Sequence, residues 1–355
     1  MIKKIAFLPA NKDVCVAARY YSLLEGYELV HIFTPESVKL DGKPINILDG
    51  GPAVPIFLSG YSEEKLLECD SLFVASSYKI EDQLFCKKIV DTAVNSGIEV
   101  FSSSLLSNNL GKNVKAVSYF SEQDMPVKSD RLYEVKVPVI TVLSQGAYTN
   151  QFAVELALRK YFSNKGYKIS QIGSNELSYF FGFESIPGFI FDQLDAYKKI
   201  LKFNHYVRQM LEKEKPELMI IGVPDAIMKY NNRILQGAGV LPFIIGSSVK
   251  SDLSILCMYY NMYKKQYFED ISNFLNCRLD ALVKYFNISN TTIGTTSGLA
   301  DSLDYIGLDS EFVSNNIKSD IYTDGHFAFN VLDDNFSEKA FDLMYDDLTN
   351  NVFAL

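Results

Sequence analysis

The chain of 355 residues contains no tryptophan, only three histidines and only five cysteines, and each shortage excludes a class of site. The cysteines are scattered and never form a C-x-x-C pair, which disfavours a disulfide framework, a zinc site and an iron–sulfur cluster. The histidines share no metal-ligand spacing, so we expect no metal centre built on them. Without tryptophan, aromatic burial depends on 22 tyrosines and 25 phenylalanines.

Positive charge and long apolar runs are also scarce. The formal net charge is −9, which argues against a nucleic-acid partner because such binding depends largely on lysine and arginine. No apolar run approaches the roughly 20 residues that a membrane-spanning helix needs. We therefore expect no membrane association and a cytoplasmic location.

What is present is a regular alternation of short apolar runs with longer amphipathic stretches. This pattern predicts an α/β fold in which helical crossovers connect the strands of parallel sheets. The length favours two domains, and the polar stretch 121–135 is the best boundary between them. We predict two doubly wound, mostly parallel sheet domains: a Rossmann-like domain over 1–134, and a P-loop-NTPase-like domain with a degenerate phosphate loop and a C-terminal extension over 135–355.

One stretch of the predicted second domain, 137–160, has the layout of a phosphate-binding loop. An apolar strand run is followed by a small polar loop and then by an amphipathic helix, where free backbone amides and the helix dipole favour an anion. A Walker loop reads G-x-x-x-x-G-K-[ST], but this loop has one glycine and no lysine. An ordinary strand-to-helix turn therefore remains the alternative. The candidate ligand-binding residues are Ser144, Gln145, Gly146, Thr149, Asn150 and Gln151.

Asp225 follows another apolar strand run, ELMIIGV, where an acid that positions magnesium would lie. If both runs are parallel strands, Asp225 and the loop 144–151 should meet at the same edge of the sheet. The next loop carries Lys229 and Arg233, either of which would replace the missing cation; surface positions for both are the alternative. The cofactor predicted from these residues, if there is one, is a nucleotide with magnesium.

Four segments of the predicted second domain resemble a bacterial family of peptide-maturation accessory proteins. They are VITVLSQGAYTNQFAVELALRKYF with GYKISQIGSNELSYFFGFESIPGF, ELMIIGVPDAIMKYNN, and SILCMYYN. The family is associated with radical-SAM maturases of cysteine-rich precursor peptides. The second domain also resembles, distantly, P-loop proteins of the dethiobiotin-synthetase type. The resemblance implies a lysine at or near Gln151, ahead of Phe152, and this chain departs from that pattern.

The resemblance implies an accessory protein that binds a precursor peptide, a radical-SAM maturase, or both. Aromatic side chains around 179–191, or the acidic surface, would meet a cationic peptide; burial of those aromatics is the alternative. A different class of function is an ATP-dependent ligase or transferase that uses the degenerate loop. A homo-oligomer without a ligand is a third alternative.

Overall fold

The computed structural model describes residues 2–35, 38–75, 80–102, 110–111, 113–117, 130–294, 303–317 and 325–350. Spatial contacts divide the chain into two compact units. The first contains Met1–Phe120 with Asn175–Ser185, and the second contains Ser121–Ser174 with Ile186–Leu355. The sequence placed the boundary near residue 134, in a stretch whose residues 121–129 lie outside the described ranges.

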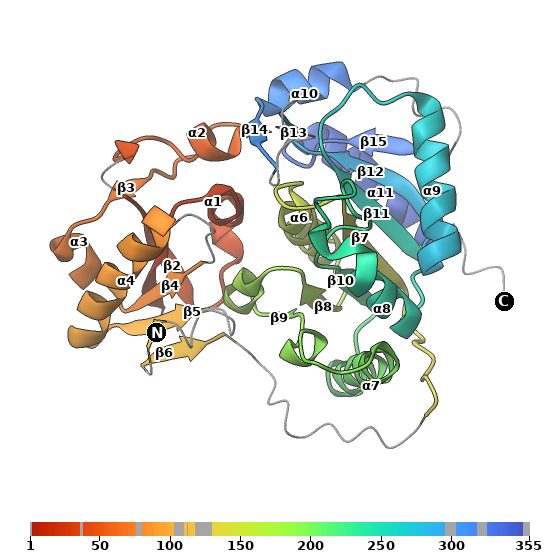
Figure 1. Ribbon diagram of the computed structural model, residues 1–355, viewed down its shortest axis with the longest axis horizontal. Helices are drawn as coiled ribbons and strands as arrows, with labels where there is room; N and C mark the ends of the chain where they lie inside the picture. The colour runs from red at the N-terminus through yellow and green to blue at the C-terminus, as the bar shows by residue number, and fades with distance from the viewer. Residues whose placement is uncertain are drawn as a thin grey trace. The chain divides into compact units, whose positions relative to one another are not determined.

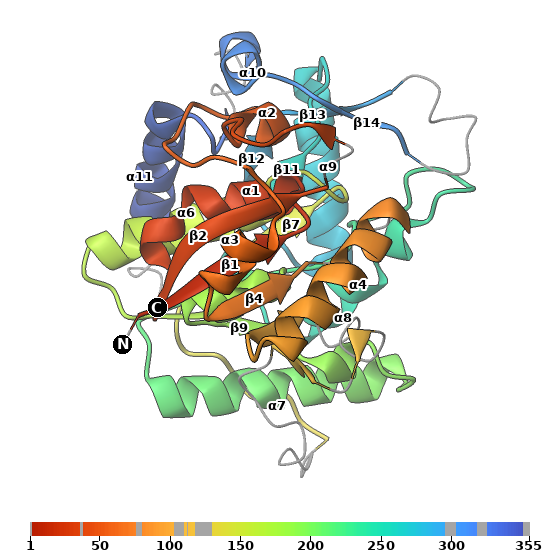
Figure 2. The same cartoon turned by 90° about the vertical axis from the view of Figure 1, so that its left-hand side faces the viewer.

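The first unit is built on a six-stranded parallel sheet with the order β3-β2-β1-β4-β5-β6. Figure 2 shows β2, β1 and β4 side by side. An order of 3-2-1-4-5-6 is that of the Rossmann fold, so this unit is Rossmann-like. The strands are β1 (Lys3–Leu8), β2 (Tyr27–Thr34), β3 (Ser59–Gly60), β4 (Ser71–Val74), β5 (Glu99–Ser102) and β6 (Val114–Ala116).

Helices connect these strands, and the sequence explains where they begin. The side chain of Asn11 accepts a hydrogen bond from the Val14 amide and caps the first helix, and Ser62 caps the third in the same way. The helices are α1 (Lys12–Arg19), α2 (Asn46–Asp49), α3 (Glu63–Leu67) and α4 (Ile80–Asn95), with a 3₁₀ turn at Tyr21–Leu23.

An aromatic residue from the second half of the sequence completes the core of the first unit. The ring of Phe180 lies 5.7 Å from Phe7, 5.1 Å from Phe73 and 5.7 Å from Phe101. It belongs to a 3₁₀ helix, Glu176–Phe181, within the segment 175–185. Phe180, Phe181, Phe183 and Phe189 are all buried, and only Phe191 of the predicted aromatic group is exposed. Most of these aromatic side chains are therefore buried and do not form a surface for a peptide.

The second unit is built on a parallel sheet with the order β15-β12-β11-β7-β10-β8. The central strands β7, β10 and β11 are buried along their whole length, which explains their continuous apolar sequences. The strands are β7 (Val139–Ser144), β8 (Ile169–Gly173), β10 (Leu218–Gly222), β11 (Leu253–Met258), β12 (Val283–Ile288) and β15 (Phe327–Phe329). The two-residue strand β9 (Glu184–Ser185) lies in the segment 175–185 of the first unit. A separate antiparallel pair is formed by β13 (Thr291–Ile293) and β14 (Tyr305–Gly307).

Helices cover both faces of this sheet (Figure 1). One face carries α6 (Gln151–Asn164) and α11 (Asp334–Asn350), which contact each other; the other carries α7 (Ala196–Glu214), α8 (Val240–Ser248) and α9 (Lys265–Leu279), packed in succession. A short α10 (Ser310–Asn316) follows β14. Helix α7 begins at Ala196 because the side chain of Asp195 accepts a hydrogen bond from the Lys198 amide and caps it.

The two units confirm the predicted class, an α/β fold with two mostly parallel sheets flanked by helices. The chain enters the second sheet at its centre, in β7, and the following helix α6 lies on the opposite face from α7, α8 and α9. In such a sheet the crevice at the carboxyl ends of the central strands is where ligands bind. None of the helices in the described residues is both long and apolar enough to cross a membrane.

Candidate functional site

The loop between β7 and α6 contains two residues with an unusual backbone conformation. Tyr148 and Asn150 have left-handed backbones, with φ of 62° and 60°. Asparagine tolerates this region better than most residues, and Asn150 is the N-cap of α6. Left-handed residues alternating with others turn successive N–H groups toward one side, which makes an anion-binding concavity. The local backbone is therefore of the phosphate-loop type.

Side chains from β12 and β13 hold the carbonyl groups of this loop. Asn287 Nδ2 donates to the Thr149 carbonyl at 3.0 Å, and Thr291 Oγ1 donates to the Tyr148 carbonyl at 2.7 Å. Within the described part of the chain, the amides of Ala147, Thr149, Asn150 and Gln151 have no hydrogen-bond acceptor. The described residues thus leave four amide donors of this loop unused.

The hydroxyl groups predicted to contact a ligand are instead used inside the loop. Ser144 Oγ and Thr149 Oγ1 both donate to the carbonyl of Gly146, and Ser144 Oγ also accepts from the Gly146 amide at 2.8 Å. Asn150 Nδ2 donates to Asn290 at 2.8 Å, whereas its buried Oδ1 has no partner among the described residues. Ser144 and Thr149 therefore shape the loop in this structure.

Gln151 occupies the position of the missing lysine, but its amide group is already fully used as a donor. Its Nε2 donates to the carbonyls of Val142 at 2.8 Å and Val223 at 2.7 Å, at the ends of β7 and β10. An amide nitrogen has two hydrogens, so none is left for a phosphate oxygen. The next residue, where the motif requires a hydroxyl, is Phe152, which is buried. Neither the charge nor the magnesium ligand of a Walker loop is supplied here.

Gln145 points away from the loop, toward tyrosines that follow β11. Its Nε2 donates to Tyr267 Oη at 3.0 Å, and its Oε1 accepts from the Tyr259 amide at 3.1 Å. Both ends of the Gln145 side chain are thereby engaged in fixing the β11–α9 connection to the loop. We assign Gln145 a positioning role.

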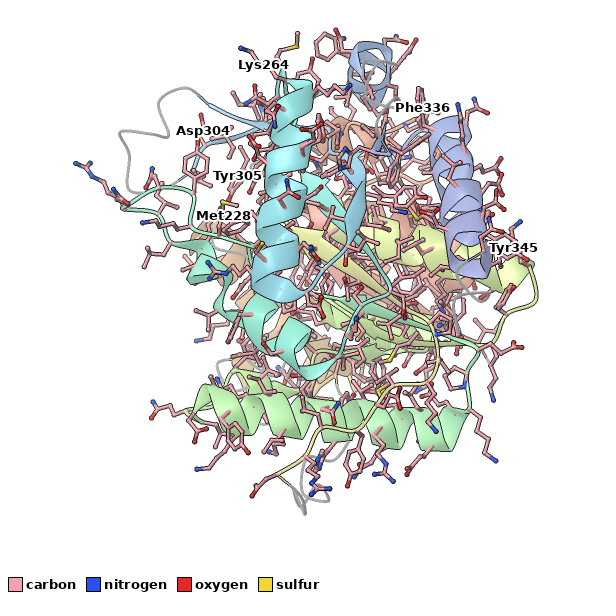
Figure 3. All side chains as sticks on the ribbon, turned by 90° about the vertical axis from the view of Figure 1, so that its right-hand side faces the viewer. Met228, Lys264, Asp304, Tyr305, Phe336 and Tyr345 are labelled. Carbon is pink, nitrogen blue, oxygen red and sulfur yellow. The ribbon has the colours of Figure 1, made fainter. Side chains whose placement is uncertain are left out.

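Tyr259 and Gln236 cover Gly146, and sequence reasoning missed both. A Cβ atom built on Gly146 would lie 2.3 Å from Tyr259 Oη and 2.8 Å from Gln236 Oε1. Both oxygens are buried. Burial raises the pKa of Tyr259, so its hydroxyl is neutral. Figure 3 shows Tyr305, whose Oη accepts from Gln236 Nε2 at 3.2 Å, on β14 of this unit. Only glycine fits beneath this cover.

Asp225 lies at the same sheet edge as the loop, as the sequence predicted. The Ile227 amide donates to the Ser144 carbonyl at 2.9 Å, which joins the segment after β10 to the end of β7. Asp225 is left-handed, with φ of 65°, and loss of hydration raises the pKa of its carboxyl group. Its carboxylate makes no hydrogen bond or ion pair within the described residues and would be the magnesium ligand.

The contacts of the described residues do not bring Lys229 or Arg233, the two predicted substitutes for the missing cation, to the loop. Lys229 Nζ donates to Asn232 Oδ1 at 2.7 Å, and both residues are exposed. Arg233 is also exposed, and its backbone amide donates to Asn231 Oδ1. No group of three or more histidine, cysteine, aspartate or glutamate residues that would hold a metal is found among the described residues. The described residues therefore do not fit a magnesium nucleotide in the manner of a Walker loop.

Glu155 is a second residue that sequence reasoning missed. It is fully buried on α6, one turn after Gln151, and accepts hydrogen bonds from Ser174 Oγ at 2.6 Å and the Ser174 amide at 3.0 Å. Burial raises the pKa of Glu155 to about 8. Its carboxylate also packs on Gly222, where an added Cβ would lie 2.2 Å from Oε1. An acid inside the apolar run FAVELAL was the available signal.

Comparison with known proteins gives similarity of fold only. No family model matches the chain, and no curated protein matches it in sequence. The chain is similar to the crystal structure of a DUF1611 family protein from Anabaena variabilis, with a TM-score of 0.60 and 10% identity, over 98% of this chain and 100% of that one.

Two further solved structures match with lower TM-scores. An apo GTPase from Pyrococcus abyssi aligns with a TM-score of 0.28 and 10% identity, over 42% of this chain and 66% of that one. A pseudomurein peptide ligase type C from Methanothermus fervidus aligns with a TM-score of 0.27 and 11% identity, over 80% of this chain and 44% of that one. These two alignments are too weak to carry a functional argument.

Proposed function

We propose that this protein is a binding or scaffolding accessory protein that does not turn over a nucleotide at its phosphate-type loop. The observation that carries the proposal is Gln151, whose two amide hydrogens are both donated to the carbonyls of Val142 and Val223. Catalysis of phosphoryl transfer requires cations that neutralise the developing charge. No such cation is held at the loop by the described residues.

The pathway we propose is maturation of a ribosomally synthesised peptide natural product, with a precursor peptide or a radical-SAM maturase as the partner. Its support is the sequence resemblance over the loop and the segments that follow it. The net charge of −9 also suits a cationic partner. Retention of either partner by the immobilised protein in a pull-down is the expected result, and loss of both in the same experiment would reject this role.

The second candidate, an ATP-dependent ligase or transferase, is favoured by one observation: the carboxylate of Asp225 lies at the same sheet edge as the loop and makes no hydrogen bond or ion pair within the described residues. In that case Thr149 would contribute to phosphate binding, and Lys229 or Arg233 would stabilise the transferred charge. Thr149→Ala and Asp225→Ala should then abolish ATP-dependent turnover. Turnover that survives both substitutions would remove these roles.

A further inference from the structure

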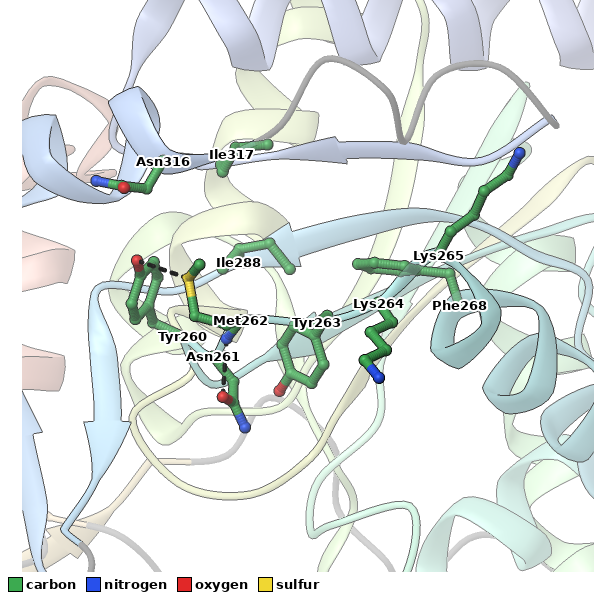
Figure 4. Close-up of a pocket in the computed structure, with 10 residues that line it drawn as sticks. All are labelled: Tyr260, Asn261, Met262, Tyr263, Lys264, Lys265, Phe268, Ile288, Asn316 and Ile317. Atoms are coloured by element: carbon green, nitrogen blue, oxygen red, sulfur yellow. Dashed lines mark hydrogen bonds between the residues drawn. The ribbon is translucent and has the colours of Figure 1, made fainter.

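A separate cavity of about 460 Å³ opens at the carboxyl ends of β11 and β12, within the second unit (Figure 4). Its size falls in the range of small-molecule sites, roughly 300–1,000 Å³, and its walls are largely aromatic and aliphatic, as in such sites. This inference does not depend on the accessory role proposed above. The lining residues are Tyr260, Asn261, Met262, Tyr263, Lys264, Lys265, Phe268, Ile288, Asn316 and Ile317.

Rigid aromatic rings form part of the cavity wall. Tyr263 is stacked on Tyr267, with ring centroids 4.8 Å apart, and its hydroxyl donates to the Tyr259 carbonyl at 2.9 Å. Tyr260 packs on Phe312 with centroids 5.7 Å apart. Side chains held in this way bind a flat apolar body with little loss of conformational entropy. Met262 is 67% exposed and adds an adaptable apolar contact.

The charge around the cavity selects for an anion. Two of the lining residues are lysines and none is acidic, although the protein as a whole has a net charge of −9. Lys264 makes no ion pair within the described residues and is the N-cap of α9, which has no side-chain cap and no acid in its first turn (Figure 3). The nearest acids of α9, Glu269 and Asp270, both accept from Gln266. A single anionic group at the rim would face Lys264 and the positive end of the helix dipole.

We propose that this cavity binds a small amphipathic anion, meaning a molecule with a flat apolar body and one carboxylate, sulfonate or phosphate group. The apolar body would lie between Tyr263, Met262 and Ile288. The anionic group would lie beside Lys264.

The test uses two dyes that share an aromatic body and differ in charge. The anion 1-anilinonaphthalene-8-sulfonate and the uncharged N-phenyl-1-naphthylamine are titrated into the full-length protein and followed by fluorescence. Lys264→Met should weaken binding of the sulfonate by about twofold to fivefold, the value of one exposed charge interaction, and leave the uncharged dye unchanged. The control is Lys250→Met, which also removes one positive charge. Lys250 precedes β11 and therefore lies at the opposite edge of the sheet, at the amino ends of the strands.

A second pair of variants tests the location of the apolar body. Met262→Glu places a like charge in the cavity and should weaken the sulfonate at least tenfold, whereas Leu343→Glu on α11 should not change its binding. Circular dichroism establishes that each variant is folded. Equal effects of Lys264→Met and Lys250→Met, an unchanged affinity in Met262→Glu, or no saturable binding of the sulfonate would overturn the proposal.

Discussion

At the scale of single residues, the buried acid Glu155 determines how stability depends on pH. Its pKa is raised by burial from 4.5 to about 8, so the folded protein binds a proton that the unfolded chain releases between these values. The stabilisation is complete below pH 4.5 and is lost as the pH rises toward 8. At most, the free energy of unfolding falls by about 1.4 kcal/mol per pH unit across this window.

Replacement of Glu155 by glutamine should remove this slope, because glutamine does not titrate. Urea unfolding at pH 5.5, 6.5 and 7.5 should show a steeper loss of stability for the wild type than for Glu155→Gln. Glu28→Gln, at an exposed position of β2, serves as the control and should keep the wild-type slope. Identical slopes for the wild type and Glu155→Gln would mean that Glu155 is not protonated in the folded protein.

At the scale of elements, the connection between β10 and α8 carries unusual backbone strain beside the candidate site. The four residues Gln236–Gly239 all have positive φ, of 45°, 75°, 52° and 75°. Left-handed backbone costs a residue with a Cβ about 1–2 kcal/mol, so the strain falls on Gln236 and Ala238. Such strain often occurs at functional sites. This turn holds Gln236 over Gly146 and places Gly237 against Asp225.

Two substitutions in this turn should have opposite effects on stability. Ala238→Gly should raise the free energy of unfolding by roughly 0.5–1 kcal/mol, because it removes the strained Cβ at some cost in chain entropy. Gly239→Ala should lower it, because the new Cβ would lie 2.2 Å from the Ile227 carbonyl oxygen.

The control is Gly26→Ala, which has a similar φ of +81° but no atom within 4 Å of the added Cβ. Gly239→Ala should lower the free energy of unfolding by about 1–3 kcal/mol more than Gly26→Ala does, as measured by urea unfolding. Equal losses for the two alanine variants would show that the close contact with Ile227 is absent in solution.

Part of the fold and part of the candidate site could be predicted from the sequence. Buried parallel strands have continuous apolar sequences, so the two sheets and the loop between β7 and α6 could be predicted from the sequence. The use of Gln151 was not, because it depends on the carbonyl of Val223, which is 72 residues away in the chain. The cover of Gly146 by Tyr259 and Gln236 could not be predicted either, because neither residue belongs to a sequence motif.

At the scale of the whole molecule, the first unit is discontinuous, and a cut near residue 134 would remove part of its core. Phe180 packs on Phe7, Phe73 and Phe101 and is completely buried. The sequence suggested a continuous first domain because nothing in the segment 175–185 marks it as belonging to the first half. Residues 1–134 expressed alone would leave this aromatic cluster open.

Phe180→Ala in the full-length chain should therefore destabilise the first unit by about 3–5 kcal/mol. Hydrogen exchange should become faster in β1, β4 and β5, while exchange in β7 and β11 of the second unit stays slow. Phe191→Ala, at an exposed position, should change neither. Slow exchange in β1 and β4 after Phe180→Ala would show that the first unit does not depend on this residue.

The most direct test of the central claim is calorimetric titration with ATP, ADP and GTP, each with magnesium, for the wild type and Gln151→Lys. We predict no binding by the wild type, because the loop holds no cation and Gln151 has no free donor. We predict binding by Gln151→Lys, because the loop amides are already available and the lysine supplies the charge. Binding of a magnesium nucleotide by the wild type would contradict the account and favour the ATP-dependent enzyme.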